Sequence, residues 1–105
     1  MEPKQSIIMP YHRNKEMLYY TTQLLDKIIP NEVEIIIVGN NNNLNELKVD
    51  LPKRFTYIKY DKSMLYSKTA NLGVEASHGD IITLCDQDIF SYHDWYTPLL
   101  KKLLP

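Results

Sequence analysis

Short apolar runs alternate along this chain with longer segments of helical periodicity. Two of the runs are continuously apolar, which is typical of strands buried on both faces. Between them, apolar residues recur at intervals of three and four, the spacing that places side chains on one face of a helix. This alternation predicts βαβ units and a mainly parallel sheet of about four strands. The predicted strands are residues 6–9, 34–38, 55–60 and 80–85.

Two helices are predicted between these strands. The first lies between the first two strands, with Asn14 as a suitable N-cap and Pro30 as a stop. The second covers residues 67–77, and Gly79 after it is expected to adopt the left-handed conformation common beyond a helix end. Small residues on its inner face would allow a close approach to the sheet, which gives Gly73 a packing role. That predicted face is Ala70, Gly73, Val74 and Ser77.

The last part of the chain predicts one further helix. It would begin at Thr97, with Pro98 at the first helical position. Its apolar face needs the sheet or a partner to cover it, because exposed apolar patches usually mark an interface. A homodimer and a missing C-terminal region therefore both stay open as explanations. The leucines of this face are Leu99, Leu100, Leu103 and Leu104.

Composition limits the classes of function. The 105 residues are enough for one domain. Twelve basic and 13 acidic residues give a net charge of −1, so no basic excess is available for a nucleic-acid backbone. Three glycines are too few for a glycine-rich phosphate loop of the Walker or dinucleotide type. Nucleic-acid binding and two large classes of nucleotide enzymes are thus disfavoured.

Cysteine content and hydropathy indicate the cellular compartment. Cys85 is the single cysteine, so an internal disulfide is excluded and a reducing compartment fits best. The first residues are polar, and no apolar run approaches the roughly 18 residues that span a bilayer. We therefore expect a cytoplasmic protein with no membrane span.

The sharpest chemical feature follows the fourth strand. Ligands of open parallel sheets bind beyond the carboxyl ends of the strands, and Asp86 and Asp88 come directly after an apolar run. Two carboxylates at this spacing can approach a hard divalent cation, which can bridge the oxygens of a diphosphate. With seven aspartates in the chain, about half an occurrence of Asp-x-Asp is expected by chance, so the motif alone is weak evidence. Its position directly after a predicted strand makes it more specific.

Plainer interpretations also fit some of these residues. Asp86 and Asp88 could simply cap the next helix, since aspartate is an ordinary cap residue. A receiver-like phosphoacceptor would need an acidic pair after the first strand, where Tyr11 and His12 stand instead. The three histidines show no zinc-ligand spacing. Cys85 at the end of a strand is expected to be a small hydrophobe rather than a nucleophile.

Four blocks of the sequence occur in a characteristic order: residues 6–10, 34–38, 68–73 with Ala76, and 79–88. Together they resemble the N-terminal half of the family 2, GT-A-type glycosyltransferases, over nearly the whole chain. The resemblance implies a Rossmann-like α/β fold that binds a nucleotide-diphosphate sugar. It also implies a divalent metal, manganese or magnesium, and sugar transfer to an acceptor hydroxyl on an unknown glycan or lipid.

The resemblance implies individual roles for matching residues. Asp88 would be the metal ligand, and Asp86 would contact the ribose or, through water, the metal. Pro10 and Tyr11 match the loop that touches the nucleobase. Lys68 matches a basic or polar position near the base and phosphates, although a solvated helix residue is the plain alternative.

Two departures from the family pattern limit the expected function. Gly39-Asn40 stands where the family usually has two aspartates, the second of which binds uracil; Asn40 can still donate to and accept from a base edge. The family's general base lies well after the Asp-x-Asp motif, and Asp94 is the only acid after Asp88. We therefore expect residues 1–105 to be one donor-binding region, truncated relative to the family and lacking the catalytic half. The alternative is a non-catalytic module with weak or no nucleotide binding.

Overall fold

The computed structural model describes residues 4–11, 15–40, 44–60 and 66–85. Within them, four strands form one sheet in the order β3-β2-β1-β4, and every neighbouring pair is parallel. The predicted α/β class and parallel sheet are confirmed, and each strand begins and ends within two residues of its predicted bounds. The strands are β1 (Gln5–Tyr11), β2 (Glu34–Asn40), β3 (Thr56–Tyr60) and β4 (Ile81–Leu84).

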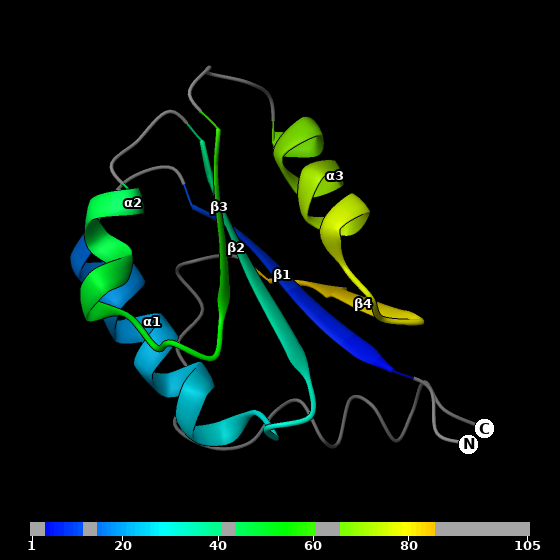
Figure 1. The fold of residues 1–105 in the computed structure, drawn as a ribbon, viewed down its shortest axis with the longest axis horizontal. Coiled ribbons are helices and arrows are strands. Elements are labelled where there is room, and N and C mark those ends of the chain that lie inside the picture. The colour runs from blue at the N-terminus through cyan, green and yellow to red at the C-terminus, as the bar shows by residue number, and fades with distance from the viewer. Residues whose placement is uncertain (1–3, 12–14, 41–43, 61–65, 86–105) are drawn as a thin grey trace.

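Helices cover both faces of the sheet. Figure 1 shows α1 (Lys15–Ile28) and α2 (Leu44–Leu47) on one side and α3 (Tyr66–Ala76) on the other. A 3₁₀ turn, Lys48–Asp50, continues α2. The helices α1 and α3 confirm the sequence prediction, whereas α2 was not predicted. The helix expected from Thr97 lies outside the described residues.

The two central strands bury alternate residues on opposite faces. Ile7 and Met9 of β1 belong to the core under α1, and Ile8 belongs to the core under α3. The same alternation places Ile35 and Ile37 of β2 against α1. All five side chains are 0% or 1% exposed. Burial on both faces is the reason that these strands are continuously apolar in sequence.

Close packing of α3 on the sheet explains Gly73. A Cβ atom there would overlap Ile8 Cγ2 and lie 3.1 Å from Val38 Cγ2. Ala70, one turn earlier, is also buried, so the predicted small inner face is confirmed at these two positions. Val74 does not belong to it, because its side chain is 37% exposed.

Gly79 has a different role from the predicted one. Its φ lies outside the left-handed region, and α3 already ends at Ala76. A Cβ atom at Gly79 would overlap Ser6 Oγ and lie 2.7 Å from the Ser6 backbone nitrogen. Glycine is therefore needed for close approach to β1, not for a left-handed cap.

The sequence predicts the edge position of one outer strand but not of the other. The partial alternation of β3 predicted an edge position, and β3 is an edge strand. The mostly apolar β4 is the other edge of the described sheet, and Ile82 and Leu84 are 37% and 50% exposed. Both share the face of Ser6 and Ile8, but α3 lies over β1 and β2. The apolar run of β4 thus does not mean burial on both faces.

Candidate functional site

The carboxyl ends of the parallel strands meet at one edge of the sheet. Tyr11 at the end of β1 pairs with Gly39 near the end of β2, and Cys85 donates a 2.9 Å backbone hydrogen bond to Ile8. The chain runs outward from β1 through β2 to β3 and then returns to β4 on the other side of β1. Strand order therefore reverses between β1 and β4, and ligands of such sheets bind at that point.

Two predicted site residues lie on β1 at this point. Pro10 is half-buried, and the Tyr11 side chain is 2% exposed within the core under α1. Burial raises the pKa of Tyr11 above its usual range. Both residues are still part of the strand rather than of the loop after it. Their contact with a nucleobase stays a prediction.

Two other predicted residues come from the neighbouring elements. Asn40 is the last residue of β2, paired with Tyr60 of β3, so its backbone lies at the carboxyl edge. Lys68 lies exposed in the first turn of α3. Figure 1 shows that this end of α3 lies towards the same edge. Four of the six predicted residues thus lie on elements that end or begin towards the carboxyl edge of the sheet, although Tyr11 faces the α1 side and α3 lies on the other.

Asp86 and Asp88 lie outside the described residues. The last described residue is Cys85, which is buried and follows β4 directly. Asp86 is the next residue in the sequence. The strand that leads into the Asp-x-Asp motif is therefore described, and it lies beside β1 at the switch point.

The sequence matches Glycosyl transferase family 2 over residues 6–104. The chain belongs to this family. It is also 29% identical over 105 residues to the uncharacterized glycosyltransferase YfnE of Bacillus subtilis (strain 168). That alignment covers 93% of this chain and 26% of YfnE, so the chain spans only a minor part of that relative. The resemblance inferred from the four sequence blocks is confirmed.

The predicted metal ligands, the two aspartates of the Asp-x-Asp motif, stay a prediction. Family 2 glycosyltransferases typically use a divalent metal, and carboxylate oxygens are the ligands that hard cations such as Mg²⁺ prefer. Among residues 4–11, 15–40, 44–60 and 66–85, no three His, Cys, Asp or Glu side chains gather closely enough to hold an ion.

No helix in the described part of the chain is long and apolar enough to cross a membrane.

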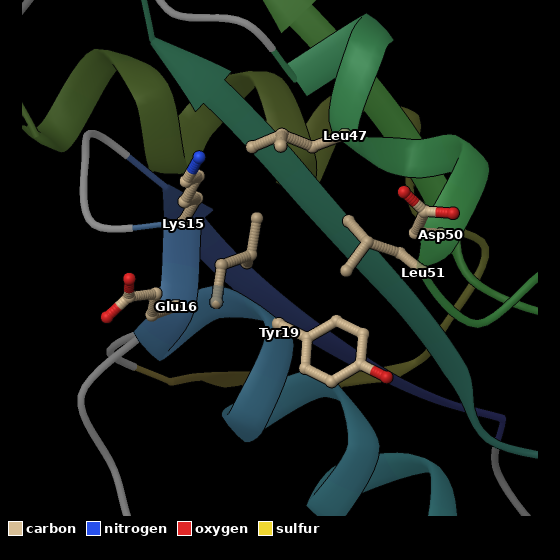
Figure 2. A pocket seen from close by; sticks show the side chains of 7 residues that line it. Lys15, Glu16, Tyr19, Leu47, Asp50 and Leu51 are labelled. Carbon is tan, nitrogen blue, oxygen red and sulfur yellow. The ribbon is translucent and has the colours of Figure 1, made fainter.

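A hollow of about 550 Å³ lies between the start of α1 and the α2 segment, which we define as α2 with the 3₁₀ turn and Leu51 after it (Figure 2). Leu47, Leu51 and the Tyr19 ring form apolar walls, and the charged ends of Lys15 and Asp50 point in different directions (Figure 2). The charges thus do not converge on one point. This hollow was not predicted because α2 was missed. The apolar spacing of Leu44, Leu47 and Leu51 could have revealed it.

Proposed function

We propose that this chain binds a nucleotide-diphosphate sugar in a metal-dependent manner. It would act as the donor-binding region of a family 2 glycosyltransferase that transfers the sugar to an acceptor hydroxyl. One observation carries the proposal: β4 lies beside β1 at the topological switch point and leads directly into Asp86. Ligand sites of open parallel sheets lie at that position.

The roles of the residues follow from their chemistry. Asp86 and Asp88 supply oxygen ligands for the cation, which when bound neutralises the charge that develops on the departing diphosphate. Lys68, exposed in the first turn of α3, offers a cation for the phosphates. Asn40, at the end of β2, offers an amide that both donates to and accepts from a base edge.

The second candidate is a non-catalytic module that keeps the fold. Gly39-Asn40 favours it, because this pair places no carboxylate at the end of β2, where the family usually has two. The two candidates predict different nucleotide affinities. Direct binding measurements therefore separate them.

Calorimetric titration of the chain with UDP, GDP and CDP, each with and without manganese, tests the proposal. We expect manganese-dependent binding of one nucleotide, lost in an Asp86→Ala, Asp88→Ala variant. Glu32→Ala, Asp50→Ala is the matched control, because it removes two exposed carboxylates elsewhere. Absence of binding by the folded wild-type chain would overturn the proposal and favour the non-catalytic module.

A further inference from the structure

The hollow between the start of α1 and the α2 segment has a half-exposed aromatic ring in its wall. Tyr19 of α1 is 53% exposed, and it lines the hollow together with Leu47 and Leu51 (Figure 2). The volume of about 550 Å³ lies within the range of roughly 300–1,000 Å³ that ligand pockets of proteins occupy. A ligand of matching size can therefore cover an aromatic face and two leucine side chains here.

The walls of the hollow are anchored in the core beneath them. Leu18, which lines the hollow from α1, is 0% exposed. The α2 segment is buried at both ends, since Leu44 at its start is 0% exposed and Leu51 at its end is 6% exposed. The hollow therefore exists before a ligand binds. A preformed site binds with a smaller loss of conformational entropy than a site that must first be ordered.

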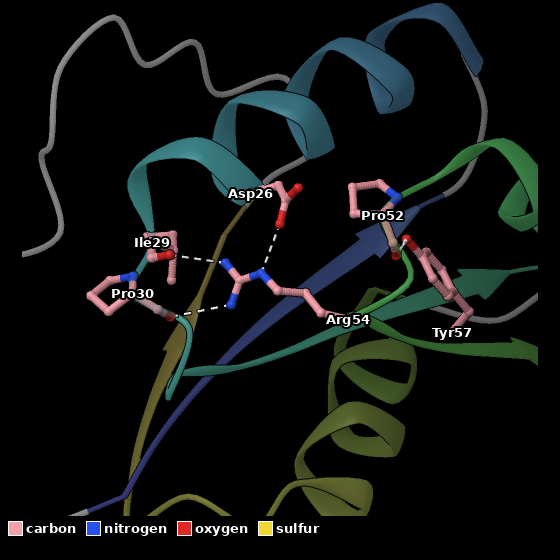
Figure 3. A network of polar contacts seen from close by, with 6 residues as sticks. All are labelled: Asp26, Ile29, Pro30, Pro52, Arg54 and Tyr57. Atoms are coloured by element: carbon pink, nitrogen blue, oxygen red, sulfur yellow. Dashed lines mark hydrogen bonds and ion pairs between the residues drawn. The ribbon is translucent and has the colours of Figure 1, made fainter.

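A second connection ties α1 to the chain that follows the α2 segment. Arg54 donates a hydrogen bond to Asp26 Oδ1 at 2.8 Å (Figure 3). It also donates to the carbonyl oxygens of Ile29 and Pro30 at 2.9 and 3.2 Å (Figure 3). These acceptors lie in the last turn of α1 and directly after it. Arg54 thus limits how far the two walls of the hollow can move apart.

The polar groups around the hollow select among classes of ligand. Lys15 offers an ammonium group that only donates, whereas Glu16 and Asp50 offer carboxylates that only accept. Two carboxylates against one ammonium leave the lining acidic, which disfavours phosphates and other anions. The charged ends of Lys15 and Asp50 point in different directions, so they do not surround a common ion (Figure 2). A fitting ligand is neutral and carries donors and acceptors at separated points.

A sugar ring has this combination of surfaces. Each hydroxyl both donates and accepts, so hydroxyls of one ring can accept from Lys15 and donate to a carboxylate. The C–H groups of the ring form an apolar face that suits the electron-rich face of Tyr19. We propose that the hollow is a binding site for a neutral saccharide, whose ring covers Tyr19 and whose hydroxyls meet the charged rim. This site goes beyond the proposed nucleotide site and shares no residue with it.

Saccharide binding to the folded chain is measured by NMR titration. The probes are glucose, galactose and N-acetylglucosamine, and the disaccharides lactose, cellobiose and chitobiose. We expect at least one probe to bind and to shift the backbone amide signals of Tyr19, Leu47 and Leu51. Cyclohexanol and inorganic phosphate are the control ligands, because one offers an apolar ring with a single hydroxyl and the other an anion. Both should bind more weakly than the best saccharide.

Matched variants test the ring and the rim. Because aromatic anchors commonly carry much of a binding energy, we expect Tyr19→Ala to raise the saccharide Kd about tenfold, while Tyr19→Phe keeps the ring and the affinity. Tyr20→Ala is the control, since Tyr20 lies on the same helix at 40% exposure but is not among the described residues that line the hollow. Asp50→Ala should weaken binding less than Tyr19→Ala, and Glu46→Ala, an exposed acid outside the lining, should not weaken it.

Three results would each overturn this inference: no saccharide probe binds, a control ligand binds as tightly as the best saccharide, or Tyr19→Ala and Tyr20→Ala have the same Kd. Should Tyr19→Ala fail to fold, the comparison of Asp50→Ala with Glu46→Ala decides.

The inference and the proposed function can fail separately. The Asp86→Ala, Asp88→Ala variant should keep the saccharide affinity of the wild type while it loses manganese-dependent nucleotide binding. A wild-type chain that binds a saccharide but no nucleotide would overturn the proposed function alone. Tighter binding of disaccharides than of monosaccharides would indicate a unit of a longer glycan as the occupant, and equal affinities would indicate a free sugar.

Discussion

On the α1 side of the sheet, large side chains fill a deep core, whereas on the α3 side a helix with small residues lies almost directly on the strands. The α1 side buries residues from β1, β2, α1 and the α2 segment in one cluster. The α3 side buries Ile8, Ile36 and Val38, with α3 contributing Leu72 and Ala76 at its margin. The first face should therefore be most sensitive to loss of volume, and the second to gain of volume.

Leu25→Ala tests the first face and should have the largest effect. Leu25 of α1 is 1% exposed, so truncation leaves a cavity that the surrounding strands cannot close. We expect a loss of about 3 kcal/mol in the free energy of unfolding, measured by urea denaturation. Leu24→Ala, on the less buried side of the same helix, is the control. Equal losses for the two variants would contradict a deep core under α1.

Gly73→Ala tests the second face by adding a single methyl group. The new Cβ would overlap Ile8 Cγ2, so α3 must move away from the sheet. We expect a loss of roughly 1–2 kcal/mol, because overpacking outweighs the gain of about 1 kcal/mol in helix propensity. Val74→Ala at the exposed neighbouring position should change the free energy of unfolding little. A stabilised Gly73→Ala variant would show that α3 does not lie against Ile8.

Tyr57→Phe tests a single hydrogen bond at the margin of the α1-side core. Tyr57 packs against that core, and its hydroxyl donates a 2.5 Å hydrogen bond to the Pro52 carbonyl. Loss of this bond should cost about 1 kcal/mol while leaving the ring packing intact. Burial, with a smaller contribution from the charge of Asp26, raises the pKa of Tyr57. Spectroscopic titration of the wild type should therefore show tyrosines that ionise above the usual range, Tyr57 and the buried Tyr11 among them, and the Tyr57→Phe variant should show one fewer.

The smallest effect on stability is expected from a change in pH, which alters the charge of Glu34 at the amino edge of the sheet. Burial raises the pKa of Glu34, but the hydrogen bonds that its carboxylate accepts from His78 and from Ser6 Oγ outweigh burial and lower the folded pKa below the usual value of 4.5. The contribution of Glu34 to stability is therefore present above that value. This contribution is lost as the pH falls through the folded pKa. Thermal unfolding between pH 3 and 6 should show a shallower slope in Glu34→Gln than in wild type. Parallel curves would contradict the hydrogen bonds to His78.

Local pattern was enough to predict much of the fold. The apolar runs placed all four strands, and the small residues of α3 predicted its close packing on the sheet. The α2 helix was missed because it is four residues long and follows a run of asparagines that indicated only a loop. The exposure of β4 was missed because an apolar sequence does not report which neighbour covers it.

The candidate site was predicted less completely. Pro10 and Tyr11, together with the backbone of Asn40, lie at the expected edge because strand ends set that position. The burial of Tyr11 was not expected, since a residue at the end of a strand can face either the core or the solvent. Nothing in the sequence pointed to the contact between Glu34 and His78, because the two residues lie 44 positions apart.

The family, the parallel α/β class and the position of each strand could be predicted from the sequence, because side-chain periodicity and motif order are properties of neighbouring residues. Three features are evident only in the folded chain: Gly79 lies against Ser6, Glu34 accepts hydrogen bonds from His78, and β4 forms an edge of the described sheet. These contacts join residues far apart in the chain. They depend on strand register and on the approach of separate elements, which local periodicity does not encode.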